Sequence, residues 1–247
     1  MPDLQWNKHS WDGSYDWQGH GEEWSKAWGS SEAQWFGSLY PRLHRFLPVE
    51  RLLEIGPGYG RWTHYLLHYV KDQYYGIDLS MQCIDACRQR FADHPQTRFE
   101  HNDGVSLVAA PDGVFDLVFS FDSLVHAEID VHQHYVPQIL AKLTTHGVAF
   151  IHHSNWRDAP SSPNRHCRAE SVSAQAYAHL VETHGGRVLV QERLIWGKKT
   201  TELVDAFTLF CRADSPRHST TVIIDNPDFM REAEAIRHTH QPYCLQP

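Results

Sequence analysis

The sequence predicts an α/β fold in which a doubly wound, mostly parallel sheet of seven strands carries helices on both faces. Three observations lead to this prediction. Short apolar runs alternate with segments of helical periodicity between residues 51 and 153, and a glycine-rich turn follows the first run. Two more strand-like runs near the C-terminus are separated by a short polar turn, which predicts an antiparallel hairpin.

Four apolar runs predict the first strands of the sheet. They are RLLEIG (51–56), QYYGIDLS (73–80), TRFEHND (97–103) and VFDLVFSFDS (114–123). Between the first two runs, Trp62, Leu66 and Tyr69 recur at helical spacing and predict a helix. Ser80 is placed to cap a second helix after the second run.

The second half of the domain continues the alternation. A helix through Ile139 is predicted to contain Pro137 in its first turn or at a kink, and GVAFIHHS (147–154) predicts a fifth strand. Residues 154–172 are rich in Pro and Ser and predict a lid loop. A helix over 173–186 and strands over 187–197 and 204–213 follow. We therefore expect the domain to span 46–213, with a C-terminal extension over 214–247 that has a helical stretch near 228–238.

Residues 1–45 are unusually aromatic and predict a cap over the active site. Such a segment is too aromatic for a disordered tail, so we expect short helices, one of them capped by Ser30. Most of the tryptophans are expected to fill the core. This much apolar surface also predicts a homodimer. Six of the nine tryptophans lie in this segment: Trp6, Trp11, Trp17, Trp24, Trp28 and Trp35.

Composition excludes several classes of protein. The net charge is 22 − 30 = −8, which argues against a nucleic-acid or anionic-membrane binder. No apolar run is long enough for a transmembrane helix, and the N-terminal MPDLQWNKHS lacks the apolar segment of a secretory signal. The five cysteines are scattered and match no zinc-site spacing. We expect a cytoplasmic protein with free thiols.

The sharpest chemical signal is EIGPGYG (54–60) at the end of the first strand. A glycine turn there lets the backbone approach a ligand, with a helix N-terminus aimed at it. The spacing is GxGxG and not the GxGxxG of dinucleotide binders. Asp78 ends the second strand, where a carboxylate can accept both ribose hydroxyls, and Asn102-Asp103-Gly104 follows the third, where the adenine amino group can bind. Acidic residues at successive strand ends favour a cationic nucleoside without phosphates.

These motifs resemble the class I S-adenosylmethionine (SAM)-dependent methyltransferases, whose domain is Rossmann-like. The segments PGYGRWT, FSFDSLVHAE and FIHHSNW, with the aromatic N-terminus, are similar to bacterial sugar O-methyltransferases, including mycobacterial enzymes that methylate O1 of 3-O-methylmannose in methylmannose polysaccharide synthesis. The resemblance implies a sugar or oligosaccharide acceptor, and Tyr15, Trp17 and Trp24 are candidates for stacking on the apolar face of that sugar. It assigns SAM binding to Glu54, Gly56, Gly58, Gly60, Asp78, Asn102, Asp103, Gly104 and Phe121.

The chemistry of methyl transfer is expected at the ends of the fourth and fifth strands. A sugar hydroxyl is nearly as weak an acid as water, whose pKa is about 15.7, so a base or a metal ion is needed. In one arrangement His126, or one of the pair His152 and His153, is the general base. In the other, Asp122 with His152 or His153 holds Mg²⁺, as carboxylates do in some related enzymes. Imidazole suits Mg²⁺ less well than carboxylate does.

Two other functions are consistent with the same motifs. One is a methyltransferase that acts on nitrogen or on a small molecule other than a sugar; it would lose little activity when the base is removed. The other is a non-catalytic module that binds SAM or a nicotinamide cofactor. The GxGxG spacing argues against nicotinamide, and the histidines at the strand ends argue against an inactive module.

Overall fold

The computed structural model describes residues 2–17, 19–162, 166–197, 200–217 and 220–240. Its centre is a sheet in the order β3-β2-β1-β4-β5-β7-β6-β8. Neighbouring strands from β3 to β5 run parallel, β7 runs antiparallel to both β5 and β6, and β8 runs parallel to β6. The strands are β1 (Val49–Ile55), β2 (Val70–Asp78), β3 (Thr97–His101), β4 (Phe115–Ser120), β5 (Leu143–Ser154), β6 (Gly186–Leu194), β7 (Asp205–Arg212) and β8 (Val222–Asn226).

This topology confirms the predicted doubly wound sheet and its C-terminal hairpin. The edge strand β8 was not predicted. It lies in the C-terminal extension, and its exposed run Val222, Ile223 and Ile224 is too short to show alternation.

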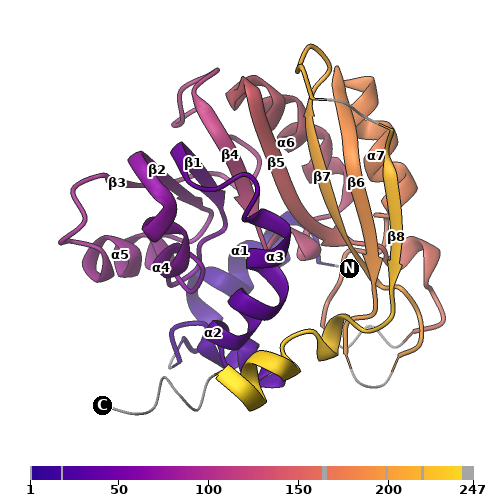
Figure 1. The fold of residues 1–247 in the computed structure, drawn as a ribbon. Helices are drawn as coiled ribbons and strands as arrows, with labels where there is room; N and C mark the ends of the chain where they lie inside the picture. Colours follow the sequence, from indigo (N-terminus) through magenta and orange to yellow (C-terminus); the bar gives the residue numbers. More distant parts are fainter. Residues whose placement is uncertain (1, 18, 163–165, 198–199, 218–219, 241–247) are drawn as a thin grey trace.

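Helices cover both faces of the sheet (Figure 1). Successive residues of a strand point to opposite faces, and Leu52 and Leu53 of β1 accordingly belong to separate apolar clusters. The cluster of Leu53 includes residues of α6 (Ile129–Lys142) and α7 (Ala174–Thr183). The cluster of Leu52 includes residues of α4 (Thr63–Leu66), α5 (Met81–Arg90) and the N-terminal helices.

Helix ends follow local sequence signals in most places. The side chains of Ser30 and Ser80 accept backbone N–H groups at the starts of α2 (Ser31–Gln34) and α5, as predicted. Pro137 lies inside α6, well past its first turn. The helix predicted after the glycine turn is shorter than expected, because α4 passes into a 3₁₀ turn (Leu67–Tyr69) and β2 begins directly at Val70.

The N-terminal segment forms a chain of short helices that packs against the C-terminal segment (Figure 1). Trp28 lies 5.7 Å from Phe229 between ring centroids, and Arg42 bonds both Glu192 of β6 and Glu232. The predicted C-terminal helix is present only as a 3₁₀ turn (Phe229–Arg231) and a π turn (Ile236–His240). The N-terminal elements are α1 (Leu4–His9), a π turn (Ser10–Ser14), a 3₁₀ helix (Glu22–Trp28), α2, a π turn (Trp35–Leu39) and α3 (Tyr40–Leu43).

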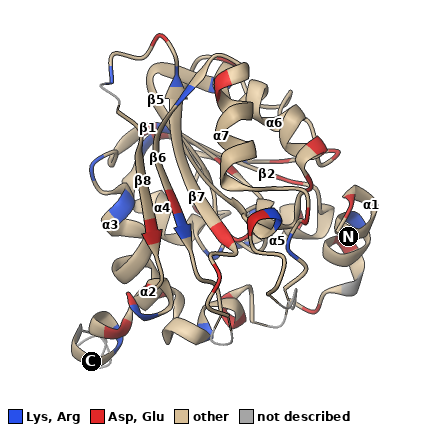
Figure 2. Cartoon of the chain, turned by 90° about the vertical axis from the view of Figure 1, so that its right-hand side faces the viewer, with Lys and Arg blue, Asp and Glu red and all other residues tan. Residues whose placement is uncertain are grey.

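The distribution of surface charges and the state of the cysteines are consistent with the sequence composition. Acidic and basic residues are interspersed along the β6–β8 edge of the sheet (Figure 2), where Arg193 pairs with Asp225. In the described ranges, no helix has the length and apolarity needed to cross a membrane. The four cysteines in these ranges are free thiols, and Cys244 lies outside them.

Candidate active site

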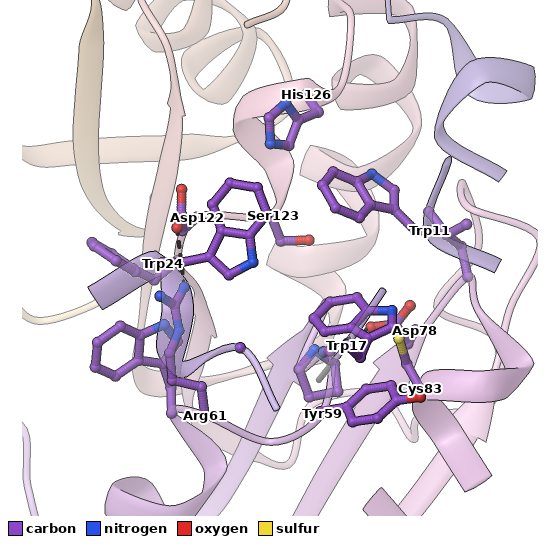
Figure 3. Close-up of a pocket in the computed structure, with 17 residues that line it drawn as sticks. Trp11, Trp17, Trp24, Tyr59, Arg61, Asp78, Cys83, Asp122, Ser123 and His126 are labelled. Atoms are coloured by element: carbon purple, nitrogen blue, oxygen red, sulfur yellow. Dashed lines mark hydrogen bonds and ion pairs between the residues drawn. The ribbon is translucent and has the colours of Figure 1, made fainter. Parts of the chain in front are cut away.

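A pocket lies at the carboxyl ends of β1, β2 and β4, under the N-terminal segment. Figure 3 shows its two ends: Asp78, Cys83, Tyr59 and Trp17 gather at one, and His126, Asp122 and Trp24 at the other. The lining residues are Trp11, Trp17, Gly21, Trp24, Gly56, Pro57, Gly58, Tyr59, Arg61, Trp62, Asp78, Leu79, Cys83, Phe121, Asp122, Ser123 and His126.

At the glycine turn, main-chain atoms and not side chains form the wall of the pocket. Gly56 and Gly58 have φ angles of 73° and 57°, in the left-handed region that favours glycine. A Cβ atom on Gly56 would lie 1.9 Å from Oγ of Ser123, and one on Gly58 would lie 3.1 Å from the ring of Trp17. These glycines therefore leave room that any other residue would fill.

Asp78 lies where a ribose-binding carboxylate is expected. Its oxygens accept the backbone N–H groups of Gly58 (3.0 Å) and Ser80 (2.9 Å). Burial raises the pKa of Asp78 to about 6, although these N–H groups favour the charged form. The carboxylate is thus ionised at neutral pH and fixed in direction.

Glu54 does not line the pocket. Its carboxyl group is buried beneath the glycine turn, where Thr63 and Tyr74 donate hydroxyl hydrogen bonds to it. Burial raises the pKa of Glu54 to about 7. We therefore expect Glu54 to hold the turn in place and not to contact SAM. Gly60 is also absent from the lining, because it faces Phe91 at the C-terminal end of α5 (Met81–Arg90).

Asn102 and Asp103 stabilise their own turn. Asp103 accepts the backbone N–H groups of Val105 and Ser106, and Asn102 bonds the carbonyl of Ser106. Gly104 instead lines a second, adjoining pocket beneath α1. This pocket is mostly apolar, which suits an adenine ring; its lining includes Leu4, Asn7, Trp11, Leu79, Gly104, Leu124, Ala127, Val131 and Tyr135.

His126 lines the pocket at the end remote from Tyr59 and Cys83 (Figure 3). Its Nδ1 donates to the carbonyl oxygen of Cys167, 2.8 Å away, since a carbonyl can only accept. Burial, reinforced by Arg168, lowers the pKa of His126 to about 4, so the ring is neutral at pH 7. A neutral ring with its proton on Nδ1 has a lone pair on Nε2, and no described residue hydrogen-bonds that atom.

His152 is fully buried and lies behind the pocket wall. Its Nδ1 accepts the backbone N–H of Asp122 (3.1 Å), which places the ring proton on Nε2, where it donates to Asp205 (3.2 Å). Both nitrogens are therefore occupied. His152 orients the residue that lines the pocket and has no lone pair left for a proton or a metal.

His153 points to the opposite face of the sheet. It donates from Nδ1 to the carbonyl of Ser154, contacts the hydroxyl of Thr208 through Nε2, and stacks on Tyr177 at 4.0 Å. Burial lowers its pKa to about 3. The expectation that one of His152 and His153 faces the pocket is thus corrected, because Phe121 and Trp196 pack against His152 on one face of β5 and Tyr177 covers His153 on the other.

Asp122 occupies the end of β4 in a left-handed conformation, with φ at 58°. One oxygen accepts from Arg61 (3.0 Å), and the other lies 3.8 Å from Arg168, which also pairs with Asp205 (2.8 Å). Arg168 and His152 hold the pKa of Asp205 at about 2 despite the opposing effect of burial. Two buried carboxylates are thus balanced by two guanidinium groups.

This network does not fit the predicted magnesium site. The carboxylate of Asp122 faces two cations, which would repel Mg²⁺, and His152 and His153 use their nitrogens elsewhere. In the described part of the chain, no three His, Cys, Asp or Glu side chains are arranged to hold a metal ion.

Sequence reasoning did not find Arg61, Arg168 and Asp205. Arg61 could have been noticed as a charged residue directly after the last glycine of the turn. Asp205 is an acidic residue at the start of an otherwise apolar strand, which signals a buried partner. Arg168 lies in the 154–172 loop and carries no local signal.

Comparisons with known proteins agree with this geometry. Residues 52–147 match the family model of the methyltransferase domain. The matched segment spans 96 of the 247 residues of the chain. It runs from β1 into β5 and includes the glycine turn, Asp78 and the His126 segment. No curated protein matches the chain at a significant level.

Solved structures share the fold of this chain. A SAM-dependent methyltransferase from Clostridium acetobutylicum is 14% identical, with 76% of this chain and 91% of that chain covered and a TM-score of 0.57. A TehB-like SAM-dependent methyltransferase from Corynebacterium glutamicum is 20% identical, with 78% and 98% covered and a TM-score of 0.53. A protein from Pyrococcus horikoshii is 16% identical, with 77% and 98% covered and a TM-score of 0.55.

The residues that line the pocket fit SAM. The glycine turn provides a cradle that a Cβ atom would fill, Asp78 can accept the ribose hydroxyls, and the second pocket has the apolar character of an adenine site. The residues that would hold SAM are Gly56, Gly58, Asp78, Leu79, Gly104 and Phe121.

Proposed function

We propose that the protein transfers a methyl group from SAM to a hydroxyl group of a sugar or oligosaccharide, with His126 as the general base. SAM supplies a methyl group bonded to a positively charged sulfur. The observation that carries the proposal is the bond from Nδ1 of His126 to Cys167, which leaves a neutral Nε2 lone pair at the pocket. A hydroxyl acceptor needs such a base because its proton is held tightly until the new bond forms.

Neighbouring residues hold His126 in place and form the pocket wall beside it. The backbone carbonyl of His126 accepts a hydrogen bond from Asn7 (2.8 Å), which fixes the base against α1. Ser123 and the Asp122–Arg61 pair form the adjoining wall of the pocket. A base held in a fixed direction can take the proton as the acceptor oxygen moves in line with the methyl group.

Aromatic side chains support a sugar as the acceptor. Trp11 and Trp24 line the pocket, their ring centroids are 6.1 Å apart, and Trp11 lies 5.3 Å from His126. Tyr15 packs against Trp24 at 5.3 Å. Indole faces beside a base offer a platform for the apolar face of a sugar ring, with one hydroxyl within reach of Nε2. 3-O-Methylmannose, whose free O1 hydroxyl would be methylated, is the first acceptor to test.

The proposal is tested by methyl transfer from labelled SAM to mannosides, glucosides and partly methylated sugars, each with Mg²⁺ and with EDTA. We expect product on one sugar at equal rates in both conditions, because Asp122 is held by arginines. Product on amines alone, or binding of S-adenosylhomocysteine without turnover on any sugar, would contradict the sugar hydroxyl as acceptor. Loss of product in EDTA would contradict the base as sole activator.

A further inference from the structure

One buried donor in the pocket has no partner in the described chain. The indole Nε1 of Trp17 is inaccessible to solvent and makes no hydrogen bond. By contrast, the indole of Trp11 donates to Oδ1 of Asn7 (3.1 Å). Buried N–H groups in native proteins nearly always have a partner, so an unpaired one at a pocket wall suggests a ligand atom.

The position of Trp17 identifies which part of a ligand it faces. Its ring stacks on Tyr59, with centroids 4.8 Å apart and planes 8° from parallel. It also lies against Gly58, whose N–H donates to Asp78. Figure 3 shows Trp17 beside Asp78, at the end of the pocket away from Asp122. Trp17 therefore faces the site of the nucleoside and not the site of the acceptor.

Other unpaired indole nitrogens have different surroundings. Nε1 of Trp28 is also buried and unpaired, but Trp28 packs against Trp196 and Phe229 outside the pocket. Nε1 of Trp62 is unpaired as well, and its ring lies under the guanidinium of Arg61, at the acceptor end. Among these three, Trp17 alone packs against Gly58 and lies beside Asp78 (Figure 3).

We propose that the indole N–H of Trp17 donates a hydrogen bond to a ribose oxygen of bound SAM, so that the N-terminal segment supplies one wall of the donor site. This inference rests on the proposed function, since it requires SAM in the pocket. Asp78 would then bind the ribose as an acceptor and Trp17 as a donor, which matches the mixed donor and acceptor character of hydroxyl groups.

The test measures binding of S-adenosylhomocysteine and of 5′-methylthioadenosine, which keeps the ribose but lacks the amino-acid carboxylate. Calorimetry compares the wild type with Trp17→Phe and with the control Trp28→Phe, which removes another buried, unpaired indole from the same segment. We expect Trp17→Phe to weaken both ligands roughly threefold to tenfold, and Trp28→Phe to change neither by more than about twofold.

Three outcomes would overturn the inference: no effect of Trp17→Phe, a loss for S-adenosylhomocysteine alone (which would indicate the carboxylate), or equal losses in both variants. If the wild type bound neither ligand, the proposed function itself would fail. A second measurement needs no variant: in ¹⁵N-labelled wild type, 5′-methylthioadenosine should shift one of the nine indole N–H signals downfield and protect it from exchange. An unchanged set of indole signals would also overturn the inference.

Discussion

Nδ1 of His126 lies 2.8 Å from the carbonyl oxygen of Cys167, a residue with a left-handed φ of 49° in the loop after β5. This bond joins the end of β4 to the 154–172 loop across the pocket. It fixes both the direction of the imidazole ring and the nitrogen that carries the proton. The loop therefore controls the base through the backbone of Cys167, and none of the loop residues that the structure describes lines the pocket.

Removing the base should stop turnover without removing the donor. We expect His126→Ala to lower kcat roughly 10²–10⁴-fold, while the Kd for S-adenosylhomocysteine stays within about twofold. Steady-state kinetics and calorimetry on the same preparation check this. Because the pKa of His126 is lowered to about 4, the wild-type kcat should fall only in acid below about pH 5. A wild-type kcat in the variant would remove His126 from the mechanism.

Donor binding should weaken in mild acid through Asp78. Its pKa in the free protein is raised to about 6, so the carboxylate gains a proton as the pH falls through this value. A protonated carboxyl group accepts ribose hydroxyls poorly, and we expect the Kd for S-adenosylhomocysteine to rise roughly tenfold between pH 7.5 and pH 5. Asp78→Asn should bind at least about tenfold more weakly at pH 7.5 and show no such pH dependence. Wild-type affinity that is constant over this range would disprove the role.

The buried pair of Arg61 and Asp122 should be strongly coupled. Asp122→Asn, which tolerates the left-handed backbone, leaves Arg61 without its carboxylate and should cost about 3 kcal/mol of unfolding free energy. The double variant Arg61→Met/Asp122→Asn should recover part of this loss, with a coupling energy of about 1–3 kcal/mol in urea unfolding. If the losses of unfolding free energy from the two single changes were additive, the coupling energy would be zero and the interaction between Arg61 and Asp122 would contribute nothing to stability.

Acid should destabilise the fold through its buried histidines. Burial lowers the pKa values of His126 and His132 to about 4 and that of His153 to about 3. Each takes up a proton on unfolding below its unfolded pKa of about 6.5, so each lowers the unfolding free energy by up to about 1.4 kcal/mol per pH unit as the pH falls. The raised pKa values of Glu54 and Asp78 act in the opposite direction in this range.

His153→Gln isolates one of these contributions, because His153 lies on the face of the sheet remote from the pocket. Denaturant unfolding between pH 6.5 and pH 4.5 should show a slope smaller by about 1.4 kcal/mol per pH unit in this variant. An identical slope would mean that His153 is not held neutral in the folded protein. Binding of S-adenosylhomocysteine should be unchanged and serves as the check of folding.

Local sequence patterns were enough to predict most of the sheet. The apolar runs, the glycine turn and the capping serines depend on neighbours in the chain, and the structure confirms Ser30 and Ser80 as caps. The edge strand β8 and the short α4 were missed, because pairing with β6 and the early start of β2 decide them. Both depend on residues far away in the sequence or on strand register.

The predicted site residues also separate into those that local sequence patterns placed correctly and those whose position depends on distant parts of the chain. Gly56, Gly58, Asp78, Phe121, Asp122 and His126 line the pocket. His152 and His153 do not, because aromatic side chains cover them on both faces of β5, Phe121 and Trp196 on one face and Tyr177 on the other. The alternation of side chains along a strand correctly predicts that the two histidines lie on opposite faces of the sheet. It does not predict which face, if either, is exposed to the pocket.

The sequence by itself determined the order of strands and helices and the position of the glycine turn and Asp78, since these follow from local patterns and strand ends. Only the tertiary structure decided the state of each ionisable side chain. In the tertiary structure Arg61 and Arg168 lie beside the carboxylate of Asp122. His152 accepts a hydrogen bond from a backbone N–H, and the carbonyl of Cys167 accepts one from His126. Such pairings join residues 30 to 61 positions apart, and electrostatic effects depend on distance and burial in space, which no local pattern encodes.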